Sequence, residues 1–181
     1  MLNKTLKQRG FTLLELLYVL ALTSILYSVA IPSFQSLIAS TQRYTLNQKL
    51  FTLIQYTRSK AAFQAQNVIL CPSKDQENCI NDWQQPLMIF TDMNNNKRRD
   101  EEELIDRIEN IALQNYHIRW RASGSSRYLR YIRDGSTSYQ NGTFTLCPTI
   151  NDVEHIQKII VYLSGRARQG KKIEIKLGDC E

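Results

Sequence analysis

The sequence has few of the residues on which active sites and metal centres depend. Its 181 residues include only two histidines, seven glycines and four prolines. It contains no Gly-x-Ser-x-Gly segment and no glycine-rich phosphate-binding loop, so no catalytic site is recognisable. No Cys-x-x-Cys pair is present, and His117 and His155 lie far from any metal-binding spacing, which argues against zinc. The sequence therefore predicts neither an enzyme nor a metal or cofactor site.

Long apolar runs are also scarce, and the mean hydropathy of −0.36 excludes a protein with many membrane spans. One run stands apart, because residues 11–31 contain a single charge, Glu15. A helix of that length measures about 30 Å, which is long enough to cross the hydrocarbon core of a bilayer. The run is longer than that of a secretory signal, and no Ala-x-Ala cleavage site follows it. These features predict a single membrane span.

The residues before this run are basic. Residues 1–10 contain no acid, so the positive-inside rule predicts a cytoplasmic N-terminus and the export of everything after Ile31. Half of the formal net charge of +6 lies in residues 1–10, so the total overstates any attraction of the rest of the chain to a polyanion. The basic residues of this N-terminal segment are Lys4, Lys7 and Arg9.

Glu15 distinguishes this run from a plain signal anchor, because a carboxylate inside a span costs about 2.5–3.5 kcal/mol at the helix centre. The segment Gly-Phe-Thr-Leu-Leu-Glu-Leu-Leu at residues 10–17 resembles the processing site of type IV prepilins and type II secretion pseudopilins. The resemblance implies that a prepilin peptidase cleaves after Gly10 and that Phe11 is then N-methylated. It also implies that Glu15 pairs with an N-terminal amine during assembly, which would offset its burial cost. The protein would move from the inner membrane into a pilus fibre at the cell surface, with other major and minor pilins as partners.

Behind the span, the chain is expected to stay helical as far as Asn67. Pro32 should bend this helix, since proline removes a backbone hydrogen bond. Apolar residues then recur at three- and four-residue spacing up to Ala65. This spacing predicts an amphipathic continuation over residues 32–67 that packs against another layer.

From Val68 onward the apolar period changes to two, which predicts strands separated by turn-rich pieces. The fold class is therefore α+β and resembles that of type IV pilins. A long N-terminal helix, first transmembrane and then amphipathic, would pack on the antiparallel sheet of an exported domain, residues 68–181. The expected strands are Val68–Cys71, Leu87–Phe90, Leu104–Ile108, Tyr116–Arg121, Arg127–Arg133, Thr143–Cys147, Lys158–Leu163 and Lys171–Leu177.

All four cysteines lie in the exported part, where an even number indicates disulfides. Three pairings are possible. We favour Cys71–Cys79, which brackets a proline-containing loop, and Cys147–Cys180, which ties a strand to the C-terminus. A bridge that closes a loop of about 30 residues adds roughly 3–4 kcal/mol in the chain-entropy model.

A polar segment between two expected strands has some features of a calcium loop. Asp92, Asn94, Asn96 and Glu103 match the liganding positions of an EF-hand. Lys97 occupies the position where glycine permits the sharp turn, and strands rather than helices are expected on both flanks. A polar hairpin turn is therefore favoured over a calcium site.

The expected C-terminal hairpin concentrates positive charge. Its loop, residues 164–170, contains two glycines that let the chain turn. Arg166 and Arg168 would point the same way if the loop is extended, and Lys171 and Lys172 add charge beside them. Arginine forks suit phosphate oxygens, so these residues are candidates for binding a phosphate backbone.

The exported half resembles the FimT/GspH-type minor pilins and pseudopilins. FimT members bind DNA through a Gly-Arg-x-Arg motif in a C-terminal loop, so the resemblance assigns DNA binding to Arg166 and Arg168 during uptake for natural transformation. The alternative is a structural minor pilin or type II pseudopilin that primes assembly without binding DNA. The matching pieces are Leu70-Cys71-Pro72-Ser73 with Cys79 and Trp83, Phe90–Asn94, Asn141–Cys147 and Gly165–Arg168.

A second basic segment precedes the hairpin. Arg127, Arg130 and Arg133 alternate with Tyr128 and Tyr131, and such a mixture could follow a nucleic-acid backbone and stack on bases. A sheet edge protected by charge explains the same pattern equally well. These arginines are therefore secondary candidates for DNA binding.

Overall fold

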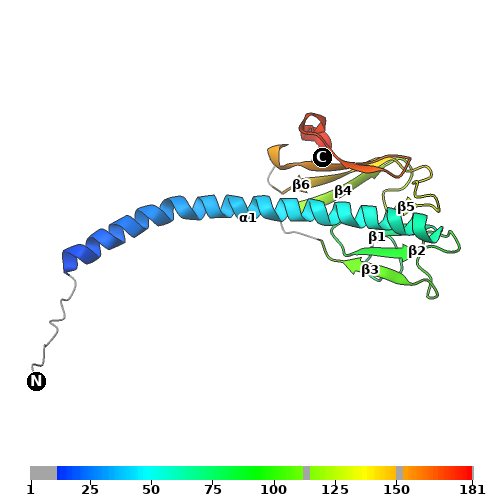
Figure 1. The fold of residues 1–181 in the computed structure, drawn as a ribbon, viewed down its shortest axis with the longest axis horizontal. Helices are drawn as coiled ribbons and strands as arrows, with labels where there is room; N and C mark the ends of the chain where they lie inside the picture. The colour runs from blue at the N-terminus through cyan, green and yellow to red at the C-terminus, as the bar shows by residue number, and fades with distance from the viewer. Residues whose placement is uncertain (1–11, 112–114, 150–152, 181) are drawn as a thin grey trace, which may run out of the picture. The chain divides into compact units, whose positions relative to one another are not determined.

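The computed structural model describes residues 12–111, 115–149 and 153–180, which form one long helix, eight strands and three short 3₁₀ helices (Figure 1). The leader lies outside the described residues, together with the expected cleavage site Gly10 and Phe11. The elements are α1 (Leu13–Gln64), β1 (Val68–Pro72), β2 (Leu87–Thr91), β3 (Ile105–Glu109), β4 (Tyr116–Ala122), β5 (Leu129–Tyr131), β6 (Gly142–Pro148), η1 (Val153–His155), β7 (Gln157–Val161), β8 (Ala167–Gln169), η2 (Lys172–Glu174) and η3 (Leu177–Cys180).

The first part of α1 belongs to a compact unit that ends at residue 42. Thr12 begins the helix, because its hydroxyl oxygen accepts a hydrogen bond of 3.2 Å from the backbone N–H of Glu15. The helix continues through Pro32, as expected, and it is long and apolar enough to cross a membrane. Its hydroxyl side chains bond back to helix carbonyls, which satisfies them without water. Examples are Thr23 to Val19, Ser28 to Ile25 and Ser33 to Val29.

The second compact unit, residues 43–181, contains the last turns of α1 as well as both sheets. The expected amphipathic segment 32–67 is thus divided after residue 42, because the buried helix residues begin at Leu46. The helix ends at Gln64, where Ala65 takes a positive φ of 52°. The helix residues in the main core are Leu46, Leu50, Leu53, Ile54 and Ala61.

Two four-stranded antiparallel sheets pack around this part of α1. Their strand orders are β3-β2-β1-β5 and β4-β6-β7-β8. β1 is buried along its whole length, because Val68 and Leu70 face the main core while Ile69 and Cys71 face a second apolar cluster. In the second sheet, Trp120 stacks on Phe144, and Trp83 from the loop between β1 and β2 packs edge-on against both rings in the main core. The expected α+β fold is confirmed.

The last expected strand is wrong. Residues 171–177 form no strand, and the partner of β7 is β8, with Ile160 opposite Arg168. The chain reverses early, because the backbone N–H of Gly165 donates to the carbonyl oxygen of Tyr162 at 2.8 Å. Alternation in the later segment does not reflect burial, since Ile173 is 88% exposed. The expected strand 127–133 is also shorter than predicted, because a turn begins at Ile132.

Two disulfides close the second unit. Cys71 is bonded to Cys79 and Cys147 to Cys180, which are the pairs that the sequence favoured. The first holds the loop after β1, and the second ties η3 to β6. The C-terminal residues therefore lie against the second sheet.

Candidate functional site

Two loops that are far apart in the sequence lie against each other. The first, residues 132–137, follows β5, and the second, residues 162–166, joins β7 to β8. The backbone N–H of Thr137 donates to the carbonyl oxygen of Leu163 at 3.1 Å, and the hydroxyl of Tyr131 donates to that of Gly165 at 3.2 Å. We call these two segments the paired loops.

Glycine is required where the paired loops meet. Gly165 has a φ of +78°, which residues with a Cβ rarely adopt. A Cβ built at position 165 would lie 1.8 Å from the carbonyl oxygen of Gly135, so a side chain there would push the loops apart. The glycine of the Gly-Arg-x-Arg motif thus has a structural reason.

Arg58 of α1 holds both loops from below. Its Nε donates to the carbonyl oxygen of Gly135 at 3.0 Å, and its Nη2 donates to that of Ser164 at 3.5 Å. The half-buried guanidinium thereby bridges the loops to the helix. The sequence did not indicate a role for this residue, because nothing local in a helix predicts a contact with two distant turns.

The paired loops present two exposed cations. Arg133 and Arg166 are exposed, and within the described ranges neither guanidinium has a hydrogen-bond or ion-pair partner. Asp134 adds one acid, whose carboxylate accepts the backbone N–H of Ser136 at 2.8 Å. That hydrogen bond keeps the pKa of Asp134 below its usual range, so it is ionised at neutral pH. Two free cations against one acid leave a local positive surface.

Arg168, by contrast, is already paired. Its Nη2 and Nη1 donate to the two carboxylate oxygens of Glu174 at 2.6 and 2.9 Å, and its Nε donates to the hydroxyl of Tyr162 at 2.7 Å. These hydrogen bonds raise the pKa of Arg168 and lower that of Glu174 to about 2, with help from the backbone N–H of Lys171. Lys171 and Lys172 are both exposed. Arg166 and Arg168 thus lie on either side of buried Ala167, but only Arg166 is unpaired.

The secondary candidates differ in their surroundings. Arg127 is exposed, whereas Arg130 is half-buried and donates to the side-chain oxygen of Asn95 at 2.6 Å. Of the two interpretations left open for this segment, base stacking does not apply to Tyr131, because its ring is fully buried in the core, and this burial raises its pKa. An exposed aromatic ring that the sequence pattern did not indicate is Tyr139, which follows the first paired loop and is 84% exposed.

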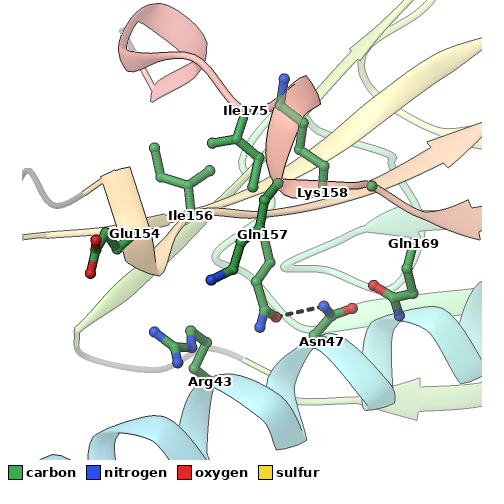
Figure 2. Close-up of a pocket in the computed structure, with 10 residues that line it drawn as sticks. Arg43, Asn47, Glu154, Ile156, Gln157, Lys158, Gln169 and Ile175 are labelled. Atoms are coloured by element: carbon green, nitrogen blue, oxygen red, sulfur yellow. Dashed lines mark hydrogen bonds between the residues drawn. The ribbon is translucent and has the colours of Figure 1, made fainter.

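A polar pocket of about 450 Å³ lies between α1 and the C-terminal residues (Figure 2). Asn47 donates to the side-chain oxygen of Gln157 at 2.5 Å, but its own oxygen Oδ1 has no partner among the described residues. One buried nitrogen of Arg43 is unpartnered in the same sense. Lys158, Lys172 and Ile175 complete the wall beneath the C-terminal segment.

The loop with calcium-like spacing is held by its own backbone. The carboxylate of Asp92 accepts backbone N–H groups of Asn96 and Lys97 at 3.0 and 3.1 Å, and that of Glu103 accepts Met93 at 2.7 Å. Burial raises the pKa of Asp92, although these bonds oppose the change. Across the described ranges, no group of three or more His, Cys, Asp or Glu residues is placed to hold a metal ion. The hydrogen bonds to the loop backbone give these carboxylates a structural role in a polar turn.

Glu15 lies in the first turn of α1, among exposed apolar side chains such as Leu14 and Leu16. Within the described residues it is the acid of that turn. An exposed apolar helix of this kind needs a membrane or neighbouring helices to cover it.

Comparisons with known proteins agree with this architecture. The family described as "Type II transport protein GspH" matches residues 47–165, and the "Prokaryotic N-terminal methylation motif" matches residues 5–31. Two crystal structures of the type IV minor pilin FimU from Pseudomonas aeruginosa share the fold at 16% identity, with TM-scores of 0.56 and 0.54. Each covers 78% of this chain, and 94% and 99% of the respective FimU chains are covered. A search of curated proteins finds no significant match.

The GspH match covers more than half of the sequence and ends at residue 165, at the start of the basic motif. The methylation motif covers residues 5–31, which include the apolar run, and this indicates membrane anchoring and assembly. The fold, with its long helix and antiparallel sheets, is that of a type IV pilin. This chain therefore belongs to the GspH family of minor pilins and pseudopilins, which are structural, non-enzymatic proteins.

Proposed function

We propose that this chain is a minor type IV pilin that binds DNA non-specifically through the paired loops during DNA uptake for natural transformation. The observation that carries the proposal is the contact, at Gly135 and Gly165, between two loops that each carry an exposed arginine, Arg133 or Arg166, with no partner among the described residues. Hydrogen bonds join the loops to each other and to Arg58, so the backbone that carries the two arginines is held in place.

The chemistry of the surface favours a phosphate backbone rather than base edges. Arginine forks bind phosphate oxygens bidentately, and such contacts carry no sequence information. Exposed Arg127, Lys171 and Lys172 would extend the positive surface, and Tyr139 offers a ring for stacking on an unpaired base. A single subunit should bind with a dissociation constant of about 10⁻⁴–10⁻⁶ M, which several subunits in one pilus would improve by avidity.

The N-terminal half supports the route by which the protein reaches that role. We infer that the leader is cleaved after Gly10, that Phe11 is methylated and that the second unit is periplasmic before assembly. The apolar exposed helix and the methylation motif support this route. Glu15 would then set the position of the subunit against the neighbouring pilin.

The decisive experiment measures duplex DNA binding by the full chain in a nonionic detergent at several salt concentrations. For Arg133→Ala/Arg166→Ala we expect weaker binding and a log–log salt slope reduced by about two, one for each lost phosphate contact. The matched control is Lys49→Ala/Lys74→Ala, which removes two exposed charges elsewhere in the second unit. Equal losses in both variants would contradict a local site.

The alternative is a structural minor pilin or type II pseudopilin that primes assembly without DNA. The exposed apolar part of α1 favours an assembly role in either case. Absence of salt-dependent DNA binding by the unaltered chain would favour this alternative.

A further inference from the structure

The outer face of the second sheet carries a set of cations. Since Ile159, Val161 and Ala167 face the helix, the residues between them face away. Lys158 of β7 lies opposite Thr145, and Arg168 of β8 lies opposite Ile160. On β6, Thr143 pairs with both Ile160 and Arg121, which extends the same face to β4. β7 and β8 thus contribute one cation each to this face, and β4 contributes two, because Arg119 pairs with Thr145 on the same face as Arg121.

The C-terminal segment crosses this face. We call residues 171–180 the strap, because the disulfide from Cys180 to Cys147 pins its end to β6. Glu174 of the strap holds both outer nitrogens of Arg168, and Asp179 lies 2.6 Å from the ammonium of Lys158. Lys158 also donates to the backbone carbonyl oxygen of Glu174 at 2.8 Å. The two acids of the strap therefore neutralise two cations of the sheet.

Charge, rather than apolar burial, holds the strap in place. Burial disfavours ionisation of Asp179, but its hydrogen bond from Lys158 and the nearby charge of Arg121 keep its pKa below the usual range. Helix η2 buries no residue, and Ile173 is 88% exposed. The pocket of about 450 Å³ lies directly beneath this segment, with Ile175 and Lys158 in its wall (Figure 2). Little packing would be lost if the strap lifted.

The geometry of the Arg168–Glu174 pair is that of an arginine bound to a phosphate. Two parallel N–H donors meet two oxygens of a planar or tetrahedral anion, and carboxylate and phosphate satisfy the fork equally well. An acid on the same chain therefore occupies the position that a phosphate oxygen of a bound polyanion would take.

We propose that the outer face of the second sheet, with Lys158 and Arg168, is a latent polyanion-binding surface, and that the strap occupies it through Glu174 and Asp179 as an internal competitor. This inference rests on the proposed function for the identity of its ligand, a nucleic-acid phosphate backbone. A DNA duplex that binds first at Arg166 would compete with the strap for its neighbour, Arg168. Binding would then use more phosphate contacts than are available while the strap occupies Lys158 and Arg168.

The test compares the full chain in nonionic detergent with Glu174→Gln/Asp179→Asn, which keeps the disulfide and removes both competing charges. We expect this variant to bind a short labelled duplex about tenfold more tightly at low salt, with a salt slope steeper by about two. Adding Arg168→Ala to the variant should cancel most of the gain. The matched control, Glu101→Gln/Glu102→Gln, removes the same charge from exposed positions in the loop between β2 and β3.

Equal gains in the control and the strap variant would overturn the proposal, because net charge alone would explain them. An unchanged slope in the strap variant would also overturn it. Retention on heparin separates this inference from the proposed function. One outcome is that the strap variant gains heparin and DNA binding, while Arg133→Ala/Arg166→Ala binds DNA as well as the unaltered chain does. That outcome would support the latent surface and contradict DNA binding by the paired loops. If no variant binds either polyanion, both fail.

Discussion

Gly165 approaches Gly135 so closely that a Cβ at position 165 would come within 1.8 Å of the carbonyl oxygen of Gly135. This contact joins a turn of the second sheet to a loop that follows the first sheet. It brings together two basic segments that are about thirty residues apart in the sequence. The contact between the paired loops therefore requires that residue 165 has no side chain.

Gly165→Ala should be strongly destabilising. A positive φ costs a residue with a Cβ about 1–2 kcal/mol, and the clash adds to that cost, so we expect a total of at least about 3 kcal/mol. The matched control is Gly124→Ala, where φ is +89° but the nearest atom to a new Cβ is 3.9 Å away. That variant should lose only the φ cost. Unfolding followed by the fluorescence of buried Trp83 and Trp120 measures both; equal losses would contradict the role of the contact.

Arg58→Met should loosen the paired loops while leaving the helix intact. Two carbonyl groups lose a charged donor, which we expect to cost about 1–2 kcal/mol and to weaken DNA binding. Lys60→Met is the control, because Lys60 pairs with Asp106 at 2.7 Å and contacts neither loop through any described bond. Loss of DNA binding in the Lys60 variant but not in the Arg58 variant would contradict this prediction.

The attachment of the strap should depend on acid pH. The pKa of Glu174 falls from an ordinary 4.5 to about 2 on folding, chiefly through its hydrogen bond from Arg168. A lowered carboxyl pKa stabilises the folded form fully above pH 4.5, and this stabilisation is lost as the pH falls towards 2. Amide hydrogen exchange in residues 171–180 should therefore accelerate in that window. Glu174→Gln/Asp179→Asn should remove the pH dependence, because the pKa of Asp179 is lowered as well, and a midpoint near neutrality would disprove the assignment.

Glu15→Val should separate insertion from assembly. Valine suits a membrane span, so the variant should fractionate with the membrane as the unaltered chain does. Its incorporation into pili should fall, because the N-terminal amine of the assembling subunits loses its carboxylate partner. Quantifying the subunit in sheared pili and in membranes tests both parts. Normal incorporation would contradict the role of Glu15.

Helix packing could be predicted because it is a local property. Leu46, Leu50 and Ile54 follow one another at four-residue spacing, and all three are buried. The same holds for β1 and β2, whose apolar runs match strands buried on both faces. In these segments the environment of each residue follows from the period of its neighbours.

The alternation of apolar and charged residues near the C-terminus predicted a strand wrongly, because there the charged residues form ion pairs and the apolar ones are not buried. The run Lys172-Ile173-Glu174-Ile175 has the period of a strand, yet Ile173 is exposed and Glu174 faces Arg168. Such a pattern cannot reveal that the chain has already reversed at Gly165 and used residues 167–169 as the strand. Because of that reversal, Arg168 lies in β8 and is paired with Glu174, which leaves Arg166 as the arginine of the motif that is available to a ligand.

The sequence by itself determined the apolar run with its N-terminal methylation motif, the change from helical to strand period, and the family. These are consequences of composition and spacing along the chain. Only the tertiary structure decided which cations are available to a ligand. Arg133 and Arg166, on touching loops, have no partner in the part of the chain that the structure describes, whereas Arg168 is neutralised by Glu174 and Arg130 is bonded to Asn95. The physical reason is that an arginine is neutralised by the acid that lies beside it in space, and that acid can come from any position in the sequence.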